Sequence, residues 1–158
     1  MIVDLVIARA IHVLAVVHWI GGVSLVTLAI LPGLRDLDPA SERLALFERI
    51  EGRFGSQAKV SVTLAGLSGF WLTWRLDLWA RFAEPGYWWM HAMVAVWLLF
   101  TVVLFIAEPL FLHAWVRRRH AITPRTTFAA IEHLHRLALA ASAVTVFAAV
   151  LGAHGLLY

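Results

Sequence analysis

Long apolar runs with few charges dominate this chain, and their lengths predict its elements. Four runs, at 10–34, 58–74, 86–116 and 137–158, have the length of helices that cross a bilayer. The second is the shortest, at about 17 residues, which is the lower limit for crossing the hydrocarbon core. Charged or Pro- and Gly-containing connections separate the runs. The pattern predicts an all-α fold, an integral membrane four-helix up-and-down bundle that forms a single transmembrane domain over 1–158.

The connection between the first two runs has a different pattern. Leu44, Phe47, Ile50 and Phe54 recur at spacings of three and four, which is typical of an amphipathic helix. We expect the segment 41–54 to lie along the membrane interface.

Basic residues are divided unequally between the connections. Ten of the 13 Lys and Arg residues belong to the first and third connections, and three belong to the other side. The positive-inside rule then places these two connections in the cytoplasm. We expect a multi-pass protein of the bacterial inner membrane with both termini in the periplasm.

Composition excludes several classes of protein. The chain is 61% hydrophobic with a mean hydropathy of +0.80, whereas soluble domains are about 45–50% apolar. It has no cysteine, which excludes disulfides, thiolate metal sites and iron–sulfur clusters. The net charge of +3 comes from residues that flank apolar runs, so the expected partner is the lipid bilayer and not nucleic acid.

Histidines within the apolar runs are the candidate functional residues, because ionisable side chains are costly in hydrocarbon. Counting the helical rise places His12, His91 and His154 on three helices in the same outer leaflet. His12 belongs to a stripe of small residues and should face the bundle, whereas His18 points elsewhere. His154 ends a three–four repeat that predicts an inward seam, formed by His133, Arg136, Ala140, Ala143, Phe147, Val150 and His154.

Two imidazoles on facing helices at one depth suit bis-histidine heme b in a four-helix bundle. The predicted pair is His12 with either His91 or His154, and Arg9 and Arg75 are candidate partners for the heme propionates. The expected function is electron transfer with a redox partner or a quinone. The simpler alternative is that each histidine is a solvated side chain near a helix end. For His18, a hydrogen bond to Ser or Thr of another helix would suffice.

Copper is the alternative metal. Met90, His91 and Met93 cluster at the start of the third run and, with His12 and His154, would form a mixed His and Met site for copper transport. A third possibility is a structural subunit of a homo-oligomer or a larger membrane complex.

Glu108 is the one acidic residue in a long apolar stretch. It could relay protons, or pair with Arg117 or a histidine at the inner boundary. The following residue, Pro109, is expected to kink the helix.

The first run carries a family resemblance. His12, Trp19, Gly21-Gly22, Leu31-Pro32 and Arg35 resemble the first helix of CopD-like membrane proteins and of HemJ-type protoporphyrinogen oxidases. Arg53-Phe54, followed by Gly66 and Gly69, is similar to the second CopD-like helix. The HemJ type implies heme b with His12 at the ligand position, and the CopD-like branch implies copper handling. Met93 stands where the HemJ type has a lysine, so the resemblance does not imply porphyrinogen oxidation.

Overall fold

The computed structural model describes residues 2–35 and 40–157, which fold into helices without a strand. The first helical segment consists of α1 (Ile2–Leu25), the π-helix η1 (Val26–Ile30) and α2 (Leu31–Leu34). The second is α3 (Ala40–Arg75), and the short 3₁₀ turns η2 (Trp79–Ala83) and η3 (Pro85–Tyr87) follow it. The third combines α4 (Trp88–Val102), the π-helix η4 (Val103–Leu112) and α5 (His113–Ile122), and the fourth is α6 (Pro124–Ala153). The predicted all-α class is confirmed.

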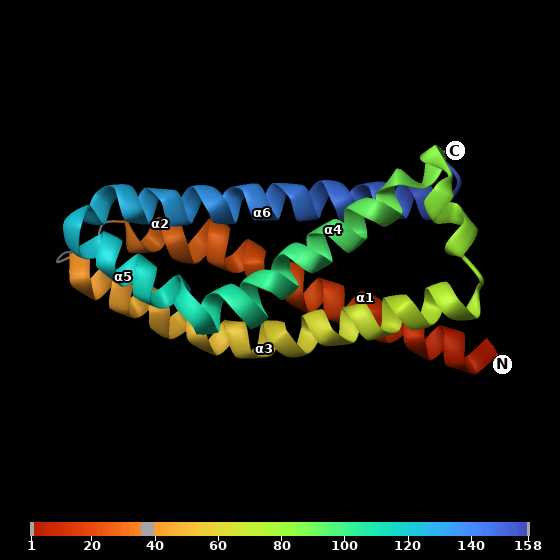
Figure 1. The fold of residues 1–158 in the computed structure, drawn as a ribbon, viewed down its shortest axis with the longest axis horizontal. Coiled ribbons are helices and arrows are strands. Elements are labelled where there is room, and N and C mark those ends of the chain that lie inside the picture. The colour runs from red at the N-terminus through yellow and green to blue at the C-terminus, as the bar shows by residue number, and fades with distance from the viewer. Residues whose placement is uncertain (1, 36–39, 158) are drawn as a thin grey trace.

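Consecutive segments run in opposite directions, so the two termini lie at the same end of the molecule (Figure 1). The most extensive packing is between α1 and α3, and α6 packs against both α4 and α5. Between its two ends the third segment crosses diagonally from α6 toward α3 (Figure 1). We name the two ends of the molecule the terminal end and the α2/α5 end.

Three of the segments are long and apolar enough to cross a membrane: Ile2–Leu34, Pro85–Ile122 and Pro124–Ala153. Large apolar side chains cover their outer surfaces, for example Leu14 at 68% exposed and Leu110 at 73% exposed. Such a surface suits lipid and not water. The predicted span 58–74 is the apolar half of α3, and α3 is not one of these three segments.

The amphipathic segment 41–54 does not form a separate interfacial helix. It is the first half of α3, a continuous helix of 36 residues. Leu44 and Phe47 are buried against Leu34, Phe128 and Ile131. The predicted apolar face is therefore correct, and it packs against α2 and α6 as an extension of the bundle.

The inward face of α6 differs from the predicted seam. Every residue of that seam, from His133 to His154, is exposed. The buried residues of α6 include Ser142, Thr145, Ala148 and Gly152. Small and weakly polar side chains allow helices to approach closely in a bilayer, where large apolar side chains gain nothing by leaving lipid. The seam prediction is wrong because it gave preference to regular spacing over side-chain size.

Both π-helices lie next to prolines. Pro32 follows η1, and Pro109 lies within η4. A proline has no N–H and its ring clashes with the carbonyl four residues earlier, so a wider turn relieves the clash. The predicted irregularity at Pro109 thus takes the form of a ten-residue π-helical stretch.

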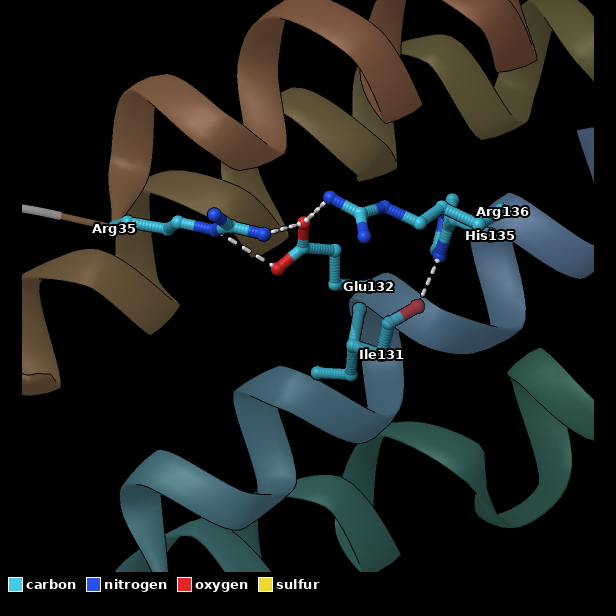
Figure 2. A network of polar contacts seen from close by, with 5 residues as sticks. All are labelled: Arg35, Ile131, Glu132, His135 and Arg136. Carbon is cyan, nitrogen blue, oxygen red and sulfur yellow. Dashed lines mark hydrogen bonds and ion pairs between the residues drawn. The ribbon is translucent and has the colours of Figure 1, made fainter.

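A buried carboxylate fastens the α2/α5 end. Glu132 of α6, whose side chain is 8% exposed, accepts hydrogen bonds from Arg35 and from Arg136 (Figure 2). Arg35 Nε lies 3.0 Å from Glu132 Oε2, and Arg136 lies 2.5 Å from Oε1. A carboxylate in this setting is tolerated only when it is paired. The network therefore ties the end of the first segment to the fourth.

Two adjacent glycines give a test of the α1–α3 packing. A Cβ on Gly22 would stand 1.9 Å from the Phe54 ring of α3, whereas a Cβ on Gly21 would have no atom within 4 Å. We expect Gly22→Ala to lower the free energy of unfolding by about 1–3 kcal/mol, because the ring must move. Gly21→Ala should leave it unchanged or slightly higher. Thermal unfolding in detergent measures both, and equal stabilities would contradict this packing.

Candidate functional site

His12 is oriented by α3. Its Nδ1 lies 2.9 Å from the carbonyl oxygen of Ala65 and 3.1 Å from Ser68 Oγ. Because a carbonyl can only accept, Nδ1 carries the proton and Nε2 is left as the basic nitrogen. A Cβ on Gly69 would stand 3.1 Å from His12 Cε1. The ring is therefore seated against the small-residue face of α3, and the predicted inward orientation of His12 is confirmed.

His18 also contacts α3. Its Nδ1 lies 2.8 Å from Ser61 Oγ. A hydrogen bond to Ser or Thr of another helix was the simpler role predicted for His18 from the sequence, and this prediction is confirmed. His18 thus has a sufficient structural partner, and it is separated from His12 by six positions along α1.

His91 and His154 do not join His12. His91 is exposed, and its ring meets Phe82 of η2 edge-to-face at 5.3 Å between centroids. His154 is exposed at the end of α6, where its Nδ1 lies 2.8 Å from the carbonyl oxygen of Val150. Within the described ranges, no group of three or more His, Asp or Glu residues has the geometry to hold a metal ion. Each of the three predicted ligands instead has its own local partner.

The two methionines belong to the packed interior and not to a polar site. Met90 is buried with Trp89 and Ala148, and Met93 packs against the same apolar cluster. His91 lies between them in sequence and points outward. The structure therefore does not assemble Met90, His91 and Met93 on one face.

The predicted propionate partners also differ in their surroundings. Arg75 forms an ion pair with Asp4 at 3.0 Å, which joins α3 to α1 at the terminal end of the molecule. Arg9 is exposed. An apolar groove of about 420 Å³ lies beside this ion pair and is lined by Asp4, Ile7, Ala8, Ile11, Leu64, Leu67, Ser68 and Trp71. It shares Ser68 with the environment of His12.

A second polar group lies toward the α2/α5 end, and most of it was missed from the sequence. Lys59 of α3 pairs with Glu108 of η4 at 3.3 Å, and Arg117 of α5 approaches Glu48 of α3 at 4.0 Å. The expected partner of Glu108 was Arg117 or a histidine, so that pairing is wrong. The nearby His113 does contact residue 108, but through the carbonyl oxygen, at 3.2 Å from Nδ1.

A signal for this group was present in the sequence. Glu48, Glu51, Gly55 and Lys59 recur at spacings of three and four, so they share one face of a helix. Gly55 makes room on that face, since its Cβ would lie 3.4 Å from Glu108 Oε1. The pattern was overlooked because the apolar stripe of the same segment gave an adequate explanation of its helical spacing.

The chain matches no family model, no curated protein and no solved structure. The resemblance of its first segment to CopD-like and HemJ-type proteins therefore remains a prediction, which rests on the residues of α1 and α2.

Proposed function

We propose that this chain is a four-span membrane protein that binds heme b through His12 and transfers electrons. The observation that carries the proposal is the orientation of His12. The Nδ1–H bond to the Ala65 carbonyl fixes the tautomer that leaves Nε2 free to act as a ligand. Metal-ligating histidines commonly donate their other ring N–H in this way, which orients the ring and makes it a stronger ligand.

The surroundings of His12 suit a largely apolar ring system. The apolar groove beside it lies between α1 and α3, and Ser68 belongs to both the groove and the His12 environment. When bound, heme would supply reversible one-electron chemistry at its iron. The residues of this chain would hold the ligating nitrogen in place and exclude water from one side of the ring.

A bis-histidine site has less support from the geometry. Neither His91 nor His154 contacts His12, and both are exposed. The proposal therefore needs only His12 as a protein ligand in one chain. Copper has no comparable support, because Met90 and Met93 are packed in an apolar cluster.

The membrane part of the proposal rests on the lengths and apolar surfaces of the helical segments. Three helical segments have the length and hydropathy of spans. The remaining segment, α3, runs alongside α1, and its apolar half carries exposed Leu64, Leu67 and Phe70. We propose that the apolar half of α3, at 58–74, is the fourth span and that the basic α2/α5 end faces the cytoplasm of a bacterial inner membrane, with a quinone or another membrane component as the electron donor.

Heme loading tests the role of His12. We expect the purified wild-type protein to show a b-type spectrum that changes on dithionite reduction. His12→Ala should lower the ratio of heme to protein about tenfold or more, because it removes the ligand. His18→Ala is the matched control, since His18 lies on the same helix and also bonds to α3, and it should keep its heme. Wild-type protein without heme, or His12→Ala with a full complement, would contradict the proposal.

Topology can be tested with engineered cysteines because the chain has none of its own. Ala83 lies in η2, Ala121 lies near the end of α5, and both are exposed. A maleimide that cannot cross membranes should label Ala83→Cys in intact spheroplasts and Ala121→Cys only after permeabilisation. The opposite result would mean an inverted orientation. Labelling of both from one side would show that the third segment does not cross the membrane.

A further inference from the structure

A mixed group of acids and bases joins α3 to the third helical segment. We name it the inner charged cluster and define it as Glu48, Glu51, Lys59, Glu108, His113 and Arg117. Two ion pairs hold it together, Lys59 with Glu108 and Arg117 with Glu48. The side chains of Glu108 and Glu48 are 15% and 24% exposed, whereas those of Lys59 and Arg117 are 33% and 61% exposed, so the acids are shielded from solvent more than the bases.

The cluster has one more carboxylate than it has permanent cations. Lys59 and Arg117 offset Glu108 and Glu48, and Glu51 follows Glu48 by three residues on the face of α3 that also carries Lys59. Within the described residues, no cation forms an ion pair with Glu51. A half-buried carboxylate in this position is costly to ionise. Its negative charge is offset only if His113 is protonated or if the carboxyl itself holds a proton.

The surroundings of Glu51 favour the protonated form of its carboxyl. The pKa of Glu51 is raised to about 7, first by burial and then by the Glu108 and Glu48 carboxylates, against an opposing effect of His113. The other helices packed against α3 are α1, α2, α4 and α6. Among the described groups, none on these helices adds an electrostatic effect on Glu51.

The cluster holds a buried acceptor atom that is not satisfied. Glu48 Oε1 is inaccessible to solvent and accepts no hydrogen bond from the described residues, whereas Glu108 Oε2, also inaccessible, has Lys59 Nζ at 3.3 Å. A proton taken up by one carboxyl would let that group donate to a neighbouring carboxylate oxygen, which relieves both the charge and the unsatisfied acceptor.

One side of the cluster is open. A groove of about 220 Å³ opens along the third segment and is lined by Glu108, Pro109, Leu110, Phe111, His113, Ala114 and Arg117. The π-helical turn at Pro109 places Glu108 and His113 on the wall of this groove. Glu108 and His113 are therefore the members of the cluster through which we expect a proton to enter.

We propose that the inner charged cluster is a proton-binding site, in which Glu51 takes up one proton from the α2/α5 end while Glu108 and His113 set how tightly it is held. The inference does not depend on heme, and it concerns a site distinct from His12.

Infrared spectroscopy of the full chain in detergent or nanodiscs tests the site, because a protonated carboxyl has its own C=O stretch. We expect one carboxyl to titrate with a midpoint near the value of about 7 given by its surroundings. Glu51→Gln should remove this transition. Glu42→Gln is the matched control, because Glu42 is exposed on the same helix, and it should leave the transition in place.

Two further variants separate the proposal from a general effect on folding. Glu108→Gln removes a neighbouring negative charge and should move the midpoint to lower pH. His113→Ala removes the opposing group and should move it to higher pH. Opposite shifts support the cluster as an electrostatic unit. The absence of a carboxyl transition between about pH 5 and 9 in the wild-type protein would overturn the proposal, as would a transition that persists in Glu51→Gln.

The pH dependence of unfolding gives an independent readout. The folded protein binds the Glu51 proton more tightly than the unfolded chain, in which glutamate has its ordinary value of 4.5. The stabilisation is therefore complete below that value and is lost as pH rises to about 7. The Tm should fall over this range in the wild-type protein, and Glu51→Gln should flatten that fall. An unchanged slope would overturn the proposal even if the variant proved less stable.

Discussion

The close approach of α1 to α3 is the contact on which the rest of the structure depends. Ser61, Ala65 and Gly69 of α3 are small enough for the rings of His12 and His18 to reach its surface, where each finds a hydrogen-bond partner. In a bilayer no hydrophobic effect drives helices together, so packing and interhelical hydrogen bonds must do so. This pair of helices fixes the orientation of His12 and forms one wall of the apolar groove.

Ionic contacts complement this packing at three levels along the molecule. Asp4 and Arg75 join α1 to α3 at the terminal end, Lys59 and Glu108 join α3 to η4, and Glu132 joins α6 to the first segment through Arg35. Each of these ionic contacts joins two segments whose apolar surfaces alone would not fix their relative position. Partly buried charges are costly unless they are paired, so these contacts favour one arrangement of the segments over alternatives.

The two proposed sites differ in how they are built. The His12 site depends on one imidazole that a backbone carbonyl orients, and its chemistry would come from a cofactor. The inner charged cluster is complete within the chain, since its acids and bases come from α3 and the third segment and a groove exposes one side. A site of this kind at one end of a redox protein would provide charge compensation when an electron enters, although each site can be tested without the other.

Much of the fold followed from the sequence. The long apolar runs predicted the helices, the spacing of Leu44 and Phe47 predicted the buried face of 41–54, and the small residues around His12 predicted its inward orientation. These signals are local, because hydropathy, residue size and helical periodicity need no information about neighbours. The predicted seam of α6 is wrong because two stripes of α6 have helical spacing. Only the packed structure shows that the stripe with the smaller side chains is the buried one.

The sequence by itself determined that the chain is helical and apolar enough for a membrane, and that His12 is oriented toward a neighbouring helix. The tertiary structure alone decided which polar residues meet. It kept His91 and His154 apart from His12, and it paired Glu108 with Lys59 and Arg117 with Glu48. Such pairings depend on the rotation and offset of helices distant in the sequence, and those are set by side-chain packing between segments that periodicity within one segment cannot reveal.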